Sequence, residues 1–141
     1  MFGLLDIFGG SKRRSALLLF DRSLTQWEVN PAYVDDGMRF AIYKWADTYA
    51  QATASSVVID DVMRAAAEMI SYCVLGTAET EAQWGPALCA EREARFAAAL
   101  AKDDDDSFDA MLIKLVLAKG IAAPDIRARV GLDMPDEKKS N

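Results

Sequence analysis

The amino-acid sequence predicts an all-α protein folded as a single compact bundle of five to six helices. Apolar residues recur at spacings of three and four, which places them on one face of a helix. No pattern of alternating polar and apolar residues, typical of strands, competes with this period. With 141 residues, of which 52% are hydrophobic, the chain is long enough to bury a core without disulfides or metals.

Proline and capping residues define the first two expected helices. The first covers residues 12–28, has Ser11 as its N-cap and ends before Pro31. The second begins at Pro31, because proline is well tolerated at the first helical position, and it has Asn30 as its N-cap. It is expected to run to about Ala52.

Glycines end the later helices. The third helix is expected from Ser55 or Ser56 to Leu75. Gly76 stops it, and a short acidic turn over residues 79–84 follows. The remaining helices are expected over residues 86–102, 107–119 and 124–130.

One domain is expected over residues 1–141, with an apolar N-terminal segment at residues 1–10 and a frayed tail at residues 133–141. No stretch approaches the ~20 consecutive apolar residues of a membrane span. The positive charges at residues 12–14 follow the apolar segment, whereas those of a secretory signal precede it. Neither a transmembrane segment nor a signal peptide is therefore expected.

The second expected helix has two apolar sides, whereas a surface helix normally has one. Tyr33, Phe40 and Tyr43 lie opposite the main apolar stripe, beside Asp36 and Asp47. We therefore expect this helix either to lie centrally between other helices or to meet a partner chain through its second stripe. The main stripe consists of Val34, Met38, Ala41, Trp45, Tyr49 and Ala52.

The N-terminal segment is apolar apart from Asp6 and is followed by the cationic residues 12–14. Residues 3–7, Gly-Leu-Leu-Asp-Ile, resemble short amphipathic membrane-active peptides, and the resemblance implies contact with a membrane surface. Such a segment can also pack on its own core or dock into the groove of a partner protein, and all three outcomes stay open. Its contact residues are expected to be Phe2, Leu5 and Phe8.

The chain contains no histidine. Histidine is the general base of Ser-His-Asp triads and the commonest ligand for zinc and non-haem iron, so such centres are excluded. Ser-x-x-Lys pairs and glycine-rich phosphate-binding loops are also missing from the sequence. We therefore expect no enzymatic activity, no cofactor and no metal.

The charge and the cysteines bear on partners and compartment. A net charge of −6 argues against a broad nucleic-acid surface, since phosphate binding needs a basic stripe. Cys73 and Cys89 both lie in apolar helical contexts, so we expect reduced, buried thiols and a cytoplasmic location.

An aspartate run at residues 103–106 precedes the fifth expected helix. Asp105, Asp106 and Asp109 have the DDxxD spacing and resemble the motif with which isoprenoid synthases hold magnesium diphosphate. The rest of that family's pattern is missing, and carboxylates also favour the positive end of a helix. We therefore expect these aspartates to cap the fifth helix, with weak cation binding as the alternative.

Residues 119–132 resemble the first helix and turn of helix-turn-helix regulators, with Gly120, Ile126 and Gly131 at the family's spacing. The resemblance implies nucleic-acid binding through this C-terminal corner. The sequence departs from the family because Arg127 replaces a small residue. Only nine residues follow the corner, which leaves no room for a recognition helix.

The function predicted from the sequence is that of a small, acidic, non-catalytic helical protein that acts by protein–protein interaction as an adaptor, regulatory or assembly accessory protein. The expected partner is another protein or a second copy of the chain. The alternatives are a nucleic-acid-binding regulator that uses the C-terminal corner and a membrane-surface protein that uses the N-terminal segment. The expected partner-binding residues are Phe2, Leu5, Phe8, Tyr33, Phe40 and Tyr43.

Overall fold

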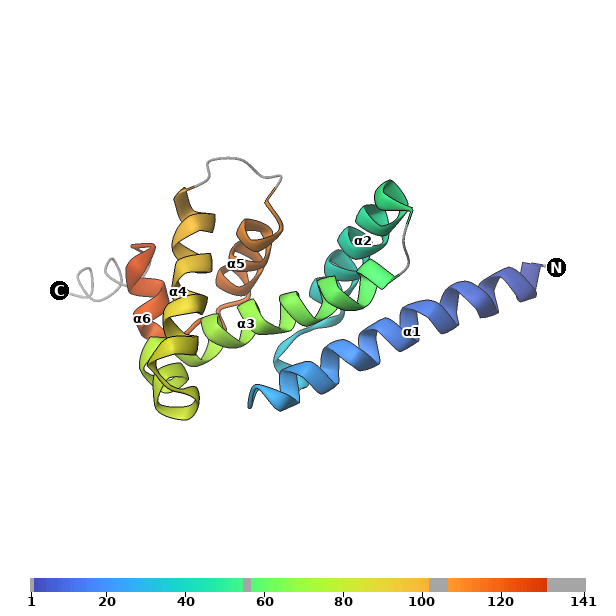
Figure 1. Ribbon diagram of the computed structural model, residues 1–141. Helices are drawn as coiled ribbons and strands as arrows, with labels where there is room; N and C mark the ends of the chain where they lie inside the picture. Colours follow the sequence, from blue (N-terminus) through green and yellow to red (C-terminus); the bar gives the residue numbers. More distant parts are fainter. Residues whose placement is uncertain (1, 55–56, 102–106, 132–141) are drawn as a thin grey trace. The chain divides into compact units, whose positions relative to one another are not determined.

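The computed structural model describes residues 2–54, 57–101 and 107–131, and it describes side chains from residue 12 onward within these ranges, except at residue 57. This part of the chain holds six α-helices and one short 3-10 helix, and it contains no strand (Figure 1). The predicted all-α class is therefore confirmed. The expected frayed tail lies outside the described residues.

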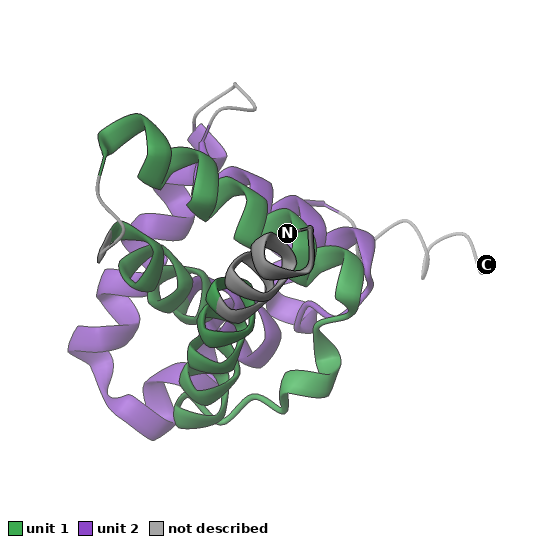
Figure 2. Cartoon of the chain, turned by 90° about the vertical axis from the view of Figure 1, so that its right-hand side faces the viewer, with its two compact units in different colours: residues 1–68 green, residues 69–141 purple. Residues whose placement is uncertain are grey.

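Two compact units divide the chain, residues 1–68 and residues 69–141, and the boundary between them falls inside a helix (Figure 2). The single domain expected from the sequence stays a prediction. The elements are α1 (Phe2–Gln26), η1 (Pro31–Tyr33), α2 (Asp36–Thr53), α3 (Val57–Trp84), α4 (Pro86–Ala101), α5 (Phe108–Ala118) and α6 (Pro124–Arg129).

The first helix starts earlier than the sequence predicts. α1 begins at Phe2, so the prediction that Ser11 caps a helix over residues 12–28 is wrong. The residues before Ser11 continue the helical segment. No free helix end therefore exists at Ser11 for its hydroxyl to cap.

The second expected helix is interrupted near its start. Asn30 acts as a cap, since its Oδ1 accepts a hydrogen bond from the Ala32 N–H at 2.9 Å, but it caps only η1. Asp35 then starts α2, and its Oδ1 accepts from the Met38 N–H at 2.9 Å. The prediction of one uninterrupted helix is wrong here, because a second N-cap follows closely after the first.

Arg39 joins the first three elements of unit 1. Its Nε donates to the Val34 carbonyl at 3.0 Å, and its Nη2 donates to the Pro31 carbonyl at 2.9 Å. Its Nη1 binds the Asp21 carboxylate of α1, and its guanidinium lies 5.7 Å from the centre of the Phe20 ring. One side chain therefore anchors the connecting segment to both α1 and α2.

α1 and α2 run antiparallel. Lys12 of α1 pairs with Asp47 in the second half of α2 at 3.5 Å, whereas Asp21 of α1 pairs with Arg39 near the start of α2. Large apolar side chains on these helices are removed from solvent, and each contributes roughly 1.5–3 kcal/mol on full burial. The buried apolar side chains of the two helices are Ala16, Phe20, Leu24, Met38, Ile42, Ala46 and Ala50.

α3 is broken at Gly76, which has φ 90° and ψ 171°. This conformation suits glycine, and the predicted interruption is confirmed. The chain re-enters a helix at once, so the expected acidic turn over residues 79–84 is wrong. The helix restarts because the Thr77 N–H donates to Oδ2 of Asp125 at 2.8 Å, an N-cap supplied from 48 residues away.

At the break in α3, one hydrogen bond within the helix is replaced by two hydrogen bonds to residues 123–125, at the start of α6, which we call the α6 segment. In a regular helix the Thr77 N–H would donate to the Cys73 carbonyl. Here that carbonyl accepts from the Ala123 N–H at 2.8 Å, and Thr77 donates to Asp125. The α6 segment is thereby fixed on α3, with Ile126 fully buried.

The core of unit 2 includes an edge-to-face pair of aromatic rings. The ring centres of Tyr72 and Phe96 lie 5.8 Å apart with planes at 62°, and the Tyr72 hydroxyl lies 2.9 Å from the Thr77 hydroxyl. Such pairs contribute about 0.5–1.5 kcal/mol beyond their area burial. The other large side chains that are fully buried here are Met69, Ile70, Leu112, Val116 and Ile126.

We expect a Gly76→Ala variant to lose more stability than a Gly85→Ala variant. The two glycines have φ of 90° and 93°, so both substitutions bring similar backbone strain. An added Cβ at Gly76 would lie 2.4 Å from Oδ1 of Asp125, whereas at Gly85 nothing lies within 4 Å. Gly76→Ala should cost about 2 kcal/mol more in the free energy of unfolding, measured by urea denaturation. Equal losses in the two variants would contradict the role given to Asp125.

Candidate functional site

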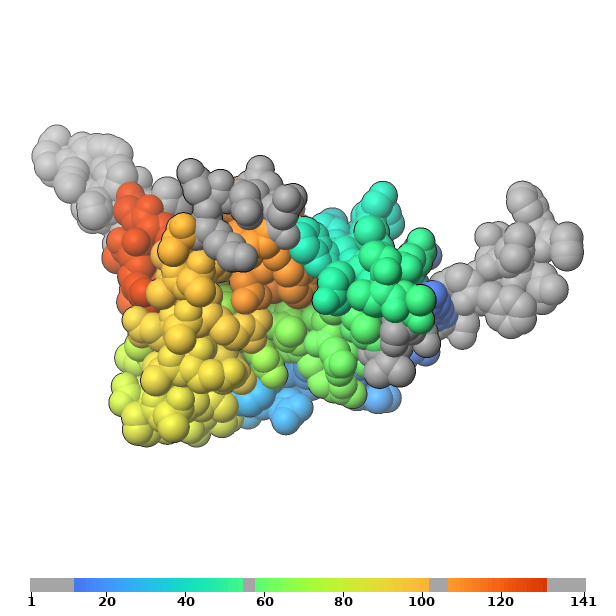
Figure 3. Space-filling model, turned by 45° about the horizontal axis from the view of Figure 1, so that its top comes forward, coloured from blue at the N-terminus to red at the C-terminus, as the bar shows by residue number. Residues whose placement is uncertain are grey.

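α2 carries large apolar side chains on both its sides. Its inner side is buried, as described above, but Phe40 is 55% exposed and Tyr49 is 50% exposed. Tyr33 of the adjoining η1 is 54% exposed. Atoms of α2, coloured teal to green, contribute to the surface shown in Figure 3. Phe40 and Tyr49 are nine residues apart and so lie on opposite sides of the helix, about 180° from one another at roughly 100° per residue. Exposed aromatic side chains of this size are typical of interface cores, and the side of α2 that carries Tyr49 is our candidate site.

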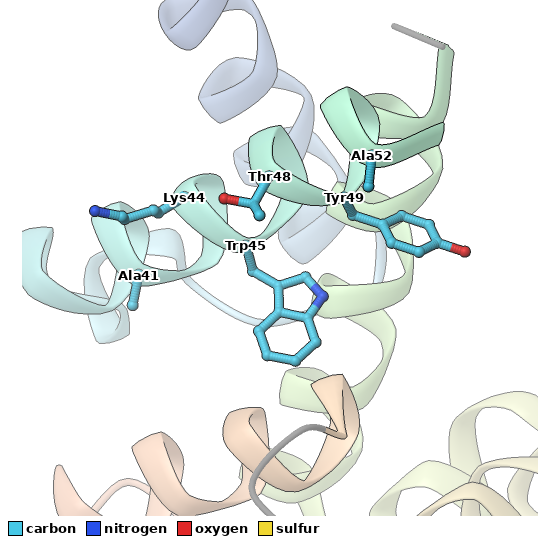
Figure 4. A pocket seen from close by; sticks show the side chains of 6 residues that line it. All are labelled: Ala41, Lys44, Trp45, Thr48, Tyr49 and Ala52. Atoms are coloured by element: carbon cyan, nitrogen blue, oxygen red, sulfur yellow. The ribbon is translucent and has the colours of Figure 1, made fainter. Parts of the chain in front are cut away.

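An open pocket of about 500 Å³ lies along this side of α2 (Figure 4). Its volume falls within the range of about 300–1,000 Å³ that is usual for ligand sites. The rings of Trp45 and Tyr49 project from the helix here (Figure 4). The lining residues are Ala41, Lys44, Trp45, Thr48, Tyr49 and Ala52, and we call them the outer face of α2.

The outer face shows how the main apolar stripe of the sequence divides. The sequence places Met38 and Tyr49 on one stripe, yet Met38 is fully buried and Tyr49 is half exposed. The residues of α2 that are fully buried follow one another at a spacing of four: Met38, Ile42 and Ala46. Sequence reasoning missed the pocket because it did not separate the buried residues of α2 from the exposed residues beside them. The available signal was the small residue Ala41 on the side that carries Tyr49.

Lys44 is the charged residue among those that line the pocket. Its Nζ lies 5.9 Å from the centre of the Phe40 ring, within reach of a cation–π contact. The other lining side chains are apolar, apart from the Thr48 hydroxyl and the Tyr49 hydroxyl. A ligand that suits this surface is therefore apolar and carries a negative group that meets Lys44.

The other predicted partner-binding residues have different positions. Tyr43 is half-buried, and burial raises the pKa of its phenol, which the Asp47 carboxylate raises further. Because Asp47 pairs with Lys12 of α1, Tyr43 belongs to the side of α2 that α1 covers. The side chains of Phe2, Leu5 and Phe8 lie outside the described residues, so their role stays a prediction.

The aspartate motif is only partly described. Asp105 and Asp106 lie outside the described residues. The Asp109 carboxylate accepts two hydrogen bonds from Arg95, at 2.8 and 3.2 Å, in a bidentate ion pair. The N-cap of α5 is Ser107, whose Oγ accepts from the Ala110 N–H at 3.2 Å, so the prediction that an aspartate caps this helix is wrong. In the described ranges, no group of three or more cysteines, aspartates or glutamates is placed to hold a metal ion.

The C-terminal corner that resembles a helix-turn-helix start packs on unit 2. Ile126 is fully buried in it. Arg129 pairs with Glu93 at 3.3 Å, and its guanidinium lies 4.8 Å from the centre of the Phe96 ring. This arginine is therefore engaged within unit 2.

Cys73 and Cys89 are free thiols, and both are buried. Burial raises the pKa of the Cys73 thiol to about 12, and the Asp109 carboxylate adds to the rise. Burial also raises the pKa of Cys89, whose Sγ donates to the Thr77 carbonyl at 3.5 Å. Because the thiolate is the nucleophile, neither cysteine is activated at neutral pH.

Comparison with protein-family models, with curated proteins and with solved structures finds no match for this chain. Within the described residues, no helix combines the length and the apolar character that crossing a membrane requires. The outer face of α2, with its pocket of about 500 Å³, is therefore the feature of the described surface from which we infer a function.

We expect Phe40→Ser and Tyr49→Ser to change the free energy of unfolding by less than about 1 kcal/mol, because both side chains are half exposed. Ile42→Ser is the matched control on the same helix, and we expect it to cost about 3 kcal/mol or more because Ile42 is fully buried. Urea denaturation measures all three. If Tyr49→Ser were as costly as Ile42→Ser, the outer face would be part of the core.

We expect the protein to lose stability at alkaline pH through Cys73. Its folded pKa of about 12 lies above the ordinary value of 9.0, so the folded state keeps the proton longer than the unfolded state. The stabilisation is fully present below pH 9 and is lost as the pH rises through about 12, at about 1.4 kcal/mol per pH unit. Urea denaturation of the reduced protein at pH 8 and pH 10.5 should show a steeper loss for the native chain than for Cys73→Ala. Equal losses of stability in the native chain and in Cys73→Ala would refute this role of Cys73.

Proposed function

We propose that the protein is non-catalytic and acts by binding another protein through the outer face of α2. The observation that carries this proposal is the pocket of about 500 Å³, with half-exposed Tyr49 in its lining. The neighbouring line of α2 is already buried within its own unit, through Met38, Ile42 and Ala46. The fold therefore does not need aromatic side chains on the outer face, whereas a binding surface does.

The shape and chemistry of the outer face suit an amphipathic helical segment of a partner. From Ala41 to Ala52 the helix rises about 16 Å, at ~1.5 Å per residue, which matches three turns of a facing helix. The apolar lining would receive apolar side chains, and Lys44 would meet a carboxylate of the partner.

Two further observations support a protein partner in a reducing compartment. Phosphate binding needs several exposed cations, but the pocket lining holds Lys44 as its charged residue, and Arg129 is engaged with Glu93. The free, buried thiols Cys73 and Cys89 support a cytoplasmic location.

Photo-crosslinking in the cells that make the protein tests the proposal. Tyr49, a half-exposed residue of the pocket lining, is replaced in the full chain by p-benzoylphenylalanine, and we expect a discrete light-dependent adduct. Ala52→Glu in the same chain should abolish it, because a carboxylate at the pocket lining disfavours an apolar ligand. Gln51→Glu is the matched control, since it adds the same charge at a neighbouring exposed position outside the lining, and it should leave the adduct unchanged.

The crosslinker at exposed Ala90 of α4 serves as a second control, where no such adduct is expected. The mass of the adduct distinguishes a second copy of the 15.5 kDa chain from a different protein. The proposal fails if position 49 yields no adduct, or if the adduct forms equally with Ala52→Glu and Gln51→Glu.

A further inference from the structure

We infer that the occupant of the outer face is the N-terminal segment of a second copy of this chain, residues 2–8. The inference rests on the proposed function and names its partner. A suitable occupant must bring apolar side chains to a pocket of about 500 Å³ and a single negative charge to Lys44 at its margin.

The sequence of this chain contains a segment with these properties. Residues 2–8, Phe-Gly-Leu-Leu-Asp-Ile-Phe, are apolar at every position except Gly3 and Asp6. Phe2, Leu5 and Phe8 recur at a spacing of three, which brings them to one side of a helix. The segment therefore offers a short apolar face with one carboxylate near it.

The two charges are complementary. Asp6 is the one charged residue of the segment, and Lys44 is the charged residue of the pocket lining. The chain as a whole carries a net charge of −6, so two copies repel one another unless opposite charges meet at the contact. An Asp6–Lys44 pair provides this attraction and sets the direction in which the segment lies along α2.

The contact must be made between two copies. α1 is a continuous helix from Phe2 to Gln26 that runs antiparallel to α2, and its Lys12 pairs with Asp47, three residues after Lys44. The helix before Lys12 therefore continues toward the C-terminal end of α2, away from Lys44. To bring Asp6 to Lys44 of its own chain, the segment would have to break this helix and turn back along α2. A second copy can present the same segment without any such break.

The size of the contact sets its strength. A segment of seven residues buries less than the ~1,200 Å² of a standard stable interface, so one such contact is weak. If each copy gives its segment to the other, the contact is made twice and the assembly closes as a dimer. We therefore expect self-association that depends on protein concentration.

A charge exchange in the full chain tests the inference by sedimentation equilibrium. We expect Lys44→Glu and Asp6→Lys each to weaken self-association by about fivefold or more, since each turns an attraction into a repulsion. The double variant should recover most of the original affinity because the pair is restored with its signs exchanged. Far-UV circular dichroism of each variant checks that it is folded.

The matched control combines Asp6→Lys with Lys119→Glu, which has the same net charge as the double variant but leaves Lys44 in place. It should not recover affinity. The inference is overturned if the native chain does not self-associate at its highest soluble concentration, or if the Lys44→Glu and Asp6→Lys double variant binds no better than either single variant.

These outcomes are separate from those of the crosslinking experiment. An adduct at position 49 that contains a different protein, lost with Ala52→Glu, keeps the proposed function and overturns the inference about the second copy. An adduct of two copies that is lost with both Ala52→Glu and Asp6→Lys supports both.

Discussion

Arg39 makes hydrogen bonds and an ion pair at the junction of α1, η1 and α2, and the orientation of α2 depends on them. The guanidinium reaches the carbonyls of Val34 and Pro31 and the carboxylate of Asp21. With its first turn held in this way, α2 can present only one line of residues to α1. Because the helical period is fixed at about 3.6 residues per turn, the outer face is then determined as well.

The candidate site could be predicted only in part. The exposed aromatics Tyr33 and Phe40 were among the expected partner-binding residues, but the pocket was not expected. Judged by the size of the side chains, the side of α2 that contains Trp45 is expected to be the most buried. In the structure the most buried side is the one that contains Ala46. Alanine adds little to a hydrophobic pattern, yet it allows close packing of helices. The position of α1, which the sequence does not reveal, decides between the two sides.

The starts of the later helices were predicted well. Pro86 and Pro124 begin α4 and α6 as expected, because proline is well tolerated at the first helical position. α5 also begins where it was expected, although its cap is Ser107 and not an aspartate. The restart of α3 after Gly76 was not predicted, since its capping carboxylate belongs to Asp125. Local patterns carry no information on a partner that distant, and only the folded chain brings it into place.

The bond between Thr77 and Asp125 has a consequence for biosynthesis. A chain is made from its N-terminus, so the amide of Thr77 leaves the ribosome 48 residues before the carboxylate that caps it. During that interval the second half of α3 lacks its N-cap, and the Cys73 carbonyl lacks the hydrogen bond from the Ala123 N–H. The second half of α3 and the α6 segment can therefore reach their final arrangement only after Asp125 has left the ribosome.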